Sequence, residues 1–335
     1  MNTQNHAMSP DQALKRRALL ASNLKMDHLK DFLFGKLIQL NAIAAIAIIF
    51  LIFIYVGKES LPIFYSPEAK KEASLDNLFA SQHYGTEDEP LSYVWQPVSE
   101  VPKYSVLPLF LGSLKVTLVA ILFAAPLAIA AAIYTAEFSS YRVREVVKPV
   151  VELLAGIPSV VLGFLALIVM ASWLQDLFHF DYRLNAINAG IALGIAIIPI
   201  IYTVSEDALT AVPRSYREAS LALGVSPWKT AWSVVLPAAT PGIFAALVLG
   251  FGRAIGETMI VLMASGNAAI TSLSFTDSVR TLSATIAAEL GEVVVGSPHY
   301  NVLFLLGAML FVVTFILNLL GEMFVGRLKR KMMGA

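Results

Sequence analysis

The sequence contains no cysteine and few charged residues. Without cysteine the chain forms no disulfide, no thiolate metal site and no cysteine nucleophile. Charged residues make up 14% of the 335 positions, against about a quarter in soluble proteins. The 24 basic residues balance the 24 acidic ones, so the net charge of zero gives no argument for a nucleic-acid partner. The five histidines are scattered and have no spacing typical of a metal site.

Motifs for nucleotide hydrolysis and for catalysis are also missing. No Gly-x-x-x-x-Gly-Lys-Ser/Thr phosphate loop occurs, so this chain does not hydrolyse ATP by that mechanism. The apolar runs contain no His–carboxylate metal set and no nucleophile–base spacing. We therefore expect no catalytic residue in this chain and do not expect it to be an enzyme. The rival interpretation, from another functional class, is a membrane scaffold or enzyme without a role in transport.

Apolar residues dominate the chain: 57% of the positions are hydrophobic, and the mean hydropathy is +0.70. A helix needs about 20 apolar residues to cross a bilayer, where each unsatisfied backbone group would cost several kcal/mol. Six stretches meet this length. We predict an all-α integral membrane protein with six transmembrane helices, at residues 37–56, 107–136, 150–172, 187–205, 238–263 and 301–323.

Lysine and arginine are distributed unevenly between the segments that separate the predicted spans. Most of them precede the first span, follow the second, lie between the fourth and fifth, or follow the last. The positive-inside rule then places both termini in the cytoplasm. The first 36 residues are mostly polar and fit a secretory signal peptide poorly. The predicted parts are a cytoplasmic N-terminal segment (1–36), a transmembrane domain (37–323) and a basic cytoplasmic tail (324–335).

The predicted outer loop at 57–106 is acidic and rich in proline, serine and asparagine. This composition favours irregular structure or short surface helices, and we interpret the loop as a solvated spacer rather than a ligand-binding element or a second domain. Its acidic side chains would repel an anion.

The cytoplasmic loop at 206–237 has the pattern of a short amphipathic helix. Pro213 and Ser215 suit the start of a helix, and Gly224 suits its C-terminal end. The apolar side chains between them fall on one face of that helix. They are Ala219, Leu221 and Ala222.

This loop resembles the coupling loop of ABC importer permeases. Seven residues match the family's Glu-Ala-Ala, Gly, Ile-x-Leu-Pro spacing, with serine for the last alanine and valine for isoleucine. They are Glu218, Ala219, Ser220, Gly224, Val234, Leu236 and Pro237. The resemblance implies the type I permease fold with a cytoplasmic coupling helix, which docks into a groove of a separate ATPase subunit. The alternative is an ordinary amphipathic surface helix between two spans.

The fifth predicted span carries two opposite charges, Arg253 and Glu257, four residues apart. A charge at the centre of a span costs about 2.5–3.5 kcal/mol or more unless it is paired or hydrated. On one helix face the two side chains are expected to pair, with Glu257 orienting Arg253. From the residues alone, a pair that only fixes helix packing and a pair that lines a transport path are equally good interpretations.

The run Gly252-Arg-Ala-Ile-Gly-Glu-Thr258, together with Gly156-Ile-Pro-Ser159 in the third span, resembles the phosphate importer permeases called PstC and PstA. The Glu-Thr-Met ending and the stretch 282–292 are closer to PstC. The resemblance implies a permease subunit for inorganic phosphate. The residues expected along its path are Arg253, Glu257, Thr258, Gly256 and Ser159. The rival cargoes are other oxyanions, namely sulfate, molybdate and phosphonate.

The resemblance also implies the partners of such a subunit. They are a homologous PstA-like permease, two cytoplasmic ATPase subunits, an external phosphate-binding protein and membrane lipid, with no nucleic acid. No cofactor belongs to this chain, because ATP and magnesium would bind the ATPase. The expected location is the bacterial cytoplasmic (inner) membrane, and transport would proceed by alternating access.

Other polar residues in or near the spans, and residues that disfavour a helix, are interpreted as structural. Lys115 is expected to extend to the membrane interface, and Glu152 to pair with Lys148 one turn earlier. Gly156 and Pro158 are expected to break the third span. The outer loop 264–300 carries four charged residues. It would gate the path or receive a binding protein, and the alternative is a solvated loop. These residues are Asp277, Arg280, Glu289 and Glu292.

Overall fold

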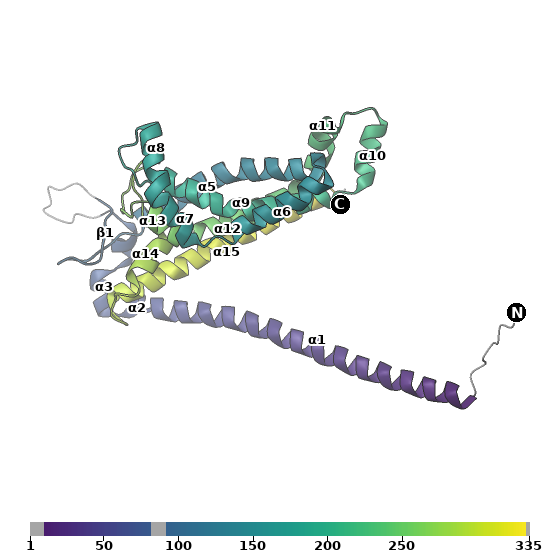
Figure 1. Cartoon of the computed structure of the whole chain (residues 1–335). Helices are drawn as coiled ribbons and strands as arrows, with labels where there is room; N and C mark the ends of the chain where they lie inside the picture. Colours follow the sequence, from purple (N-terminus) through teal and green to yellow (C-terminus); the bar gives the residue numbers. More distant parts are fainter. Residues whose placement is uncertain (1–9, 82–91, 333–335) are drawn as a thin grey trace. The chain divides into compact units, whose positions relative to one another are not determined.

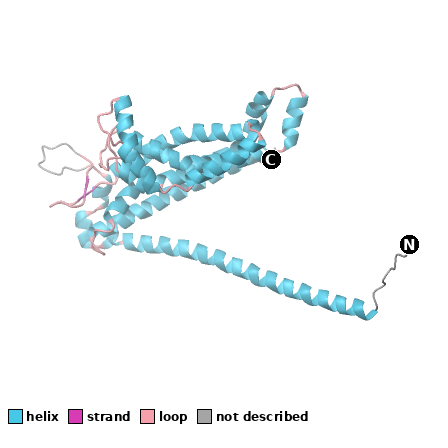
Figure 2. Cartoon of the chain, viewed as in Figure 1, coloured by secondary structure: helices cyan, strands magenta, loops and turns pink. Residues whose placement is uncertain are grey.

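The computed structural model describes residues 10–81 and 92–332, and most of them are helical (Figure 2). In this part of the chain, six helices are long and apolar enough to cross a membrane. They are Lys30–Tyr65, Leu107–Phe138, Ser159–Phe178, Ala186–Thr210, Pro227–Ile255 and Pro298–Leu328. The predicted all-α class and the number of spans are confirmed.

The chain divides into two compact units, Met1–Tyr55 and Val56–Ala335. In the first unit, the described residues belong to α1 (Pro10–Ser60). Its apolar side chains from Phe32 to Tyr55 are exposed, as expected for a helix whose neighbours are lipid or another protein. Within the predicted segment 1–36, residues 1–9 lie outside the described part, and Pro10 begins a helix that continues without interruption into the first span.

The core of the second unit is built around α5 (Leu107–Ile133), α9 (Ala186–Thr210) and α12 (Leu236–Ile255). Small residues allow these helices to pack closely. Four alanines at four-residue spacing in α5 are fully buried, namely Ala120, Ala124, Ala128 and Ala132. A Cβ on Gly190 would lie 2.5 Å from the Val119 side chain, and one on Gly250 would lie 2.7 Å from that of Ile201. α9 therefore lies between α5 and α12.

The third span begins later than predicted. A π-helical turn, η1 (Tyr134–Phe138), extends α5 and precedes α6 (Tyr141–Ala155), which has no buried residue. The chain then breaks at 156–158 and continues through α7 (Ser159–Leu165), η2 (Ala166–Met170) and α8 (Ala171–Phe178). The predicted bounds 150–172 were wrong, because the span runs from Ser159 to Phe178. Pro158 lacks a backbone N–H and disfavours helical backbone at Ile157, which separates α6 from α7. The predicted break at Gly156 and Pro158 is confirmed.

The fifth span is also interrupted, so the predicted continuous helix 238–263 was wrong. It begins with α11 (Pro227–Thr230) and η3 (Ala231–Val235), passes into α12, and resumes after a break as α13 (Met259–Ala264). α14 (Leu282–Glu289) and α15 (Pro298–Met332) follow. The helix α10 (Arg214–Ala222) and α11 lie together at one end of the bundle (Figure 1).

The opposite end carries a small packed layer, here called the cap. It comprises α2 (Pro62–Tyr65), α3 (Pro67–Glu72), α4 (Leu75–Phe79), α14, and the strands β1 (Trp95–Gln96) and β2 (Lys103–Tyr104). The two strands are antiparallel, with Trp95 opposite Tyr104. The cap has a hydrophobic cluster in which Ile63, Leu78, Trp95 and Tyr104 are buried with Leu303 and Leu306 of α15.

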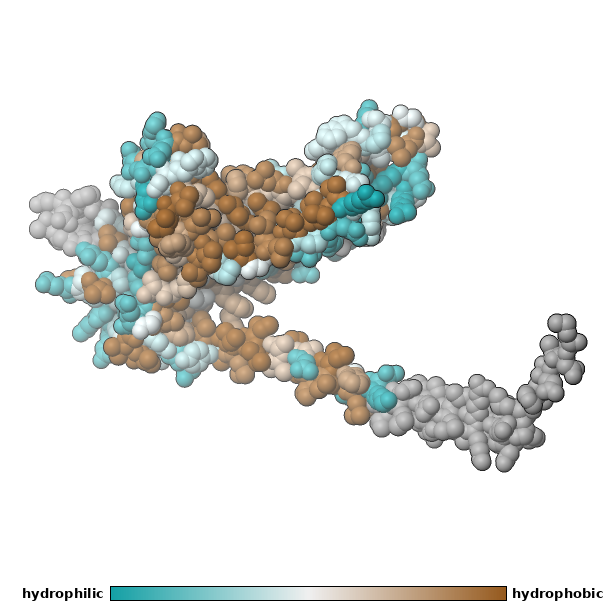
Figure 3. Space-filling view, viewed as in Figure 1, coloured by the Kyte–Doolittle hydropathy of each residue, from teal (hydrophilic) through white to brown (hydrophobic). Residues whose placement is uncertain are grey.

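The interpretation of 57–106 as a solvated spacer was therefore wrong for the described residues of the cap, because their apolar side chains pack on α15. Short helices were correctly expected there. Residues 82–91 of this loop lie outside the described part. In the second unit, Figure 3 shows apolar side chains over the middle of the bundle and polar ones at its two ends, the distribution expected of a membrane-embedded protein.

Candidate functional site

The break in the fifth span contains three of the predicted path residues, Gly256, Glu257 and Thr258. α12 ends at Ile255, and the next helix begins at Met259. The Ile260 N–H donates to the Glu257 carboxylate at 3.5 Å, and the Ser283 hydroxyl donates to the Glu257 carbonyl at 2.7 Å. The interrupted backbone is therefore held from two directions, by the first turn of α13 and by α14.

The two interrupted spans meet next to this break. A Cβ on Gly163 of α7 would lie 3.1 Å from the Ile260 Cα and 3.1 Å from the Met259 carbonyl oxygen. Only glycine permits this approach without a shift of α13. Ser159, also predicted to lie on the path, is the first residue of α7. The structure thus places the helix that Ser159 starts beside the helix that follows Glu257.

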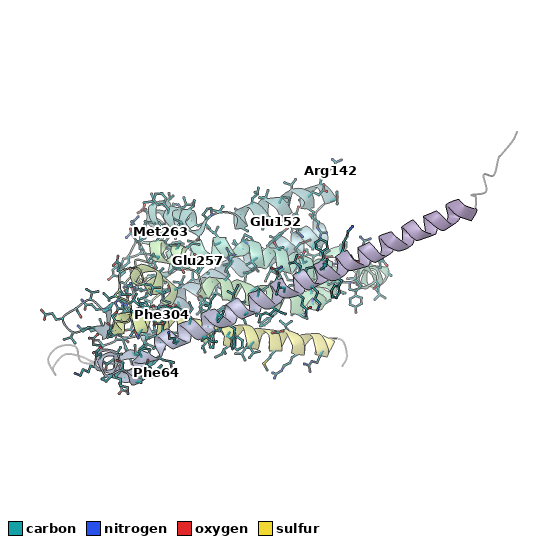
Figure 4. All side chains as sticks on the ribbon, turned by 90° about the horizontal axis from the view of Figure 1, so that it is seen from below. Phe64, Arg142, Glu152, Glu257, Met263 and Phe304 are labelled. Atoms are coloured by element: carbon teal, nitrogen blue, oxygen red, sulfur yellow. The ribbon has the colours of Figure 1, made fainter. Side chains whose placement is uncertain are left out.

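Arg253 lies in the last turn of α12 and lines a cavity of about 310 Å³. The other walls are Glu152 and Ala155 of α6 and residues Ala196, Pro199, Ile200 and Thr203 of α9. Figure 4 shows Arg142, Glu152, Glu257 and Met263 in this order along the bundle, so Glu152 and Glu257 lie away from its ends. An exposed guanidinium and a carboxylate therefore share one cavity within the bundle.

The expected ion pair between Arg253 and Glu257 is not formed within residues 10–81 and 92–332. The four-residue spacing pairs two side chains only on a continuous helix, and α12 ends between them. Gly256 and Thr258 instead line a second cavity, of about 530 Å³, whose opposite wall is α14 with Ser283 and Ala287. The break thus separates Arg253 from Gly256 and Thr258, which line different cavities.

Glu152 also differs from its interpretation as the local partner of Lys148. The Lys148 ammonium instead donates to Glu206 and to Asp207 of α9, at 3.2 Å each. Burial lowers the pKa of Lys148, but the hydrogen bonds to these two carboxylates outweigh it, so the pKa lies above its usual value. Lys148 therefore bonds to α9 and not to Glu152, and Glu152 faces the cavity that Arg253 lines.

Glu206 was counted as the first residue of a loop but lies within α9, where its side chain is 0% exposed. It accepts from Arg144, Lys148 and the Thr210 hydroxyl. Sequence reasoning missed this cluster because it assigned Glu206 to a solvent-exposed segment. A buried carboxylate with several donors joins α6 to α9 and needs no role in transport chemistry.

At the cap, two of the four charged residues of the loop 264–300, Arg280 and Glu289, are paired, whereas Glu292 is exposed. Glu289 pairs with Arg280 at 2.5 Å and with His299 Nε2 at 2.9 Å, and it accepts from Trp95 Nε1 at 3.1 Å. Burial raises the pKa of Glu289, but the hydrogen bonds of His299 and Trp95 and the charge of Arg280 together hold it below its usual value. This carboxylate connects β1, α14 and α15.

Lys115 was expected to extend to the membrane interface, and this was wrong. Its side chain is buried, and its ammonium donates to the Ser274 carbonyl at 2.8 Å. The lysine therefore anchors the loop that precedes α14 to α5. Sequence reasoning placed it correctly near the end of a span and could not see that the loop covers it.

The predicted coupling residues lie on α10, on the loop after it, and at the start of α12. α10 ends at Ala222, and Gly224 has a φ of +76°, a left-handed conformation that favours glycine. Glu218 and Ala219 are exposed, whereas Ser220 is buried and its hydroxyl lies 2.9 Å from that of Thr230. Leu236 and Pro237 begin α12. The exposed apolar side chains nearby include Leu221, Leu223 and Trp228, which is a surface suited to a protein partner.

Among residues 10–81 and 92–332, no group of three or more His, Asp or Glu side chains is placed to hold a metal ion.

Comparisons with known proteins agree with this architecture. The family described as binding-protein-dependent transport system inner membrane component matches residues 124–333. The chain is 39% identical over 226 residues to the probable ABC transporter permease protein YqgH of Bacillus subtilis, covering 68% of this chain and 73% of that protein. It is 36% identical over 242 residues to the phosphate transport system permease protein PstC of Mesorhizobium japonicum, covering 67% and 73%.

Two solved structures share the fold. A chain of a bacterial ABC transporter involved in the import of the acidic polysaccharide alginate has a TM-score of 0.57 at 17% identity, covering 92% of this chain and 98% of that one. A chain of the MetNI methionine ABC transporter has a TM-score of 0.51 at 19% identity, covering 65% and 93%. The predicted fold, that of an ABC importer type I permease, is confirmed.

Proposed function

This chain belongs to the family of inner membrane components of binding-protein-dependent transport systems, and from this premise we propose that it is one permease subunit of an ATP-driven importer of inorganic phosphate. The proposal for the cargo is supported by relatives named phosphate transport system permease protein PstC, 30–36% identical to this chain over about two thirds of its length. The subunit forms half of a translocation path, and a PstC-type assignment fits these relatives best.

The observation that carries the proposal is the position of Arg253 at the end of an interrupted helix, facing a cavity of about 310 Å³. A guanidinium presents a planar set of donors that matches two oxygens of a phosphate. Within the described residues, the side chain of Arg253 forms no ion pair or hydrogen bond, so its donors are available to an anion. The path residues are Arg253, Glu257, Thr258, Gly256 and Ser159.

One arginine does not balance the charge of a phosphate within a membrane. A homologous PstA-like permease subunit is therefore the expected second half of the path, and it would supply further donors. An external phosphate-binding protein delivers the anion. Sulfate, molybdate and phosphonate share the tetrahedral oxyanion chemistry and are the alternatives to be tested.

ATP hydrolysis belongs to two separate ATPase subunits, because this chain has no phosphate loop. ATP and magnesium bind there, and this chain needs no cofactor of its own. α10 and the residues that follow it dock on the ATPase through Glu218, Ala219, Ser220, Gly224, Leu236 and Pro237. We expect the α10–α11 end, and both termini, to lie in the cytoplasm, and the excess of lysine and arginine in those segments supports this orientation.

The test is uptake of radiolabelled phosphate by cells whose own copy of this chain is deleted and then restored. Deletion should abolish high-affinity uptake, and the restored chain should return it. Excess sulfate, molybdate or phosphonate should compete poorly. Unchanged phosphate uptake after deletion, with loss of uptake of one of these other anions, would assign the transporter to that anion instead.

A variant of α10 tests the ATPase partner in the same cells. Glu218→Lys reverses an exposed charge on the proposed docking helix and should reduce co-purification of the ATPase subunits. Glu145→Lys reverses an exposed charge on α6 and serves as the matched control. Normal co-purification with Glu218→Lys would remove Glu218 from the docking contact.

A further inference from the structure

Arg217 of α10 makes an unusually complete set of hydrogen bonds at the point where three helices meet. Its Nε donates to both Glu137 oxygens, at 3.2 and 3.1 Å, and its Nη2 donates to Glu137 Oε1 at 2.6 Å. Its Nη1 donates to the Val212 carbonyl at 2.6 Å, and Nη2 also donates to the Leu209 carbonyl at 2.9 Å. The side chains of Arg217 and Glu137 are only 21% and 9% exposed.

The acceptors belong to the ends of two helices of the bundle core. Glu137 lies in η1, the π-helical turn that continues α5. Leu209 lies in the last turn of α9, and Val212 follows two residues after that helix ends. The last carbonyls of a helix have no partner within it and carry the negative end of the helix dipole, so a cation there is stabilised. One guanidinium thus satisfies the end of α9 and a buried carboxylate at the end of α5.

The remainder of α10 is weakly attached to the bundle. Within residues 10–81 and 92–332, the other side-chain hydrogen bond from α10 is that of Ser220, which reaches Thr230 of α11. Glu218 and Ala219 are exposed, as is Arg214. Arg217 therefore provides the polar connection between α10 and the ends of α5 and α9.

α5 and α9 in turn connect this end of the bundle to the candidate path. α9 packs along α5 through Gly190 and Gly194, and its residues Pro199 and Thr203 line the cavity that contains Arg253. Close-packed helices move as rigid elements rather than deform. A displacement of Arg217 would therefore reach the wall of that cavity through α9.

We propose that Arg217, through its bonds to Glu137 and to the end of α9, is the positioning residue that transmits movement of α10 to the two central helices. This inference rests on the proposed function, because it assumes that α10 docks on an ATPase. Lysine cannot replace arginine in this role. Its single ammonium cannot span a carboxylate and two carbonyls at once, whereas the guanidinium has five N–H groups in a fixed plane.

The experiment uses the complete transporter, with its second permease subunit, ATPase subunits and binding protein, in proteoliposomes. The measured quantity is the number of phosphate ions taken up per ATP hydrolysed. Arg217→Gln, Arg217→Lys and Glu137→Gln should each lower this ratio about tenfold, the effect expected from loss of a hydrogen-bonded charge. The ATPase subunits should still co-purify with each variant, because the exposed residues of α10 are unchanged.

Arg142→Gln is the matched control, since Arg142 is an exposed arginine of α6, outside the helix that is proposed to dock on the ATPase. It should leave the ratio unchanged. The double variant Arg217→Gln with Glu137→Gln should be little worse than either single variant, because both remove the same contact.

Two results would overturn the inference. The first is an unchanged uptake ratio in Arg217→Gln and Arg217→Lys. The second is a loss of uptake that is fully explained by loss of assembly or of thermal stability in both variants, which would indicate a purely structural contact. Failure of the proposed cargo is distinguishable, because the unsubstituted transporter would then transport no phosphate and the ratio would be measured with the anion that it does transport.

Discussion

Charged side chains have opposite surroundings in two regions of the second unit. Near the break in the fifth span, Arg253 and Glu257 form no ion pair with any described residue, and Arg253 faces a cavity. At the C-terminal end of α9, Glu206 and Arg217 are surrounded by partners. A charge with several fixed partners holds helices together, whereas a charge without a partner is available to a ligand. The four predictions below test this difference.

Arg253→Gln should have the largest effect. Loss of the guanidinium removes a charge-assisted contact to the anion, so phosphate uptake should fall by about a hundredfold or more. Membrane abundance and thermal stability should change little, because the side chain has no described partner. Uptake by whole cells at matched abundance measures this.

Arg142→Gln is the control for Arg253→Gln, since Arg142 is an exposed arginine of α6 that lies outside both cavities. It should transport normally. Normal phosphate uptake by Arg253→Gln would show that Arg253 does not bind the anion. The break would then lack its proposed principal anion-binding group.

Glu206→Gln should act mainly on stability. It removes the charge that Arg144 and Lys148 share, and breaking a buried pair costs about 3–5 kcal/mol. The two cations are about one third exposed, so water compensates part of this and we expect about 2 kcal/mol. Thermal unfolding of the purified chain in detergent should shift to lower temperature. An unchanged midpoint would show that the cluster does not hold α6 to α9.

Gly163→Val tests whether the contact between α7 and α13 positions the break. Its added atoms would lie within 3.1 Å of the α13 backbone and force the two helices apart. Overpacking of this kind costs about 1–3 kcal/mol, so uptake should fall about tenfold. Gly326→Val, at a position of α15 with open space around it, is the control. Equal uptake by both variants would separate the helix contact from transport.

Glu152→Gln should have the smallest effect. The Glu152 carboxylate shares the cavity of Arg253 and disfavours an anion there. Its removal should change the apparent Km for phosphate by about threefold, towards tighter binding, at low ionic strength. Glu145→Gln, on the same helix but outside the cavity, should leave the apparent Km for phosphate unchanged. Weaker binding in Glu152→Gln would show that the carboxylate supports Arg253 instead of opposing the anion.

Much of the fold was predictable because it depends on local composition. Six apolar runs identified six spans, and Pro213 and Gly224 correctly bounded α10. The break at Pro158 was also predicted, since proline acts on its own backbone and that of its neighbour. The break at Gly256 was not predicted, because glycine tolerates a helix and only its surroundings decide whether the helix ends there.

The predicted site residues have a mixed outcome, and their roles remain predictions. Arg253, Gly256 and Thr258 line cavities, but the expected pairing of Arg253 with Glu257 was wrong. The pairing of Lys148 with Glu152 was wrong for a different reason. Both residues lie on the continuous helix α6, but the Lys148 ammonium donates to Glu206 and Asp207 of α9 instead. Arg217 received no role at all, although it is adjacent to the recognised Glu218, because its acceptors are 5, 8 and 80 residues away.

By itself, the sequence determined that this protein lies in a membrane, how many spans it has, which family it belongs to and where α10 lies along the chain. These properties depend on runs of residues and on local backbone preferences. The tertiary structure alone decided which charges are paired and which are left facing a cavity. The physical reason is that an ion pair needs two groups within a few ångströms, and in a helical bundle this distance is set by the packing of α5, α9 and α12 and not by separation along the chain.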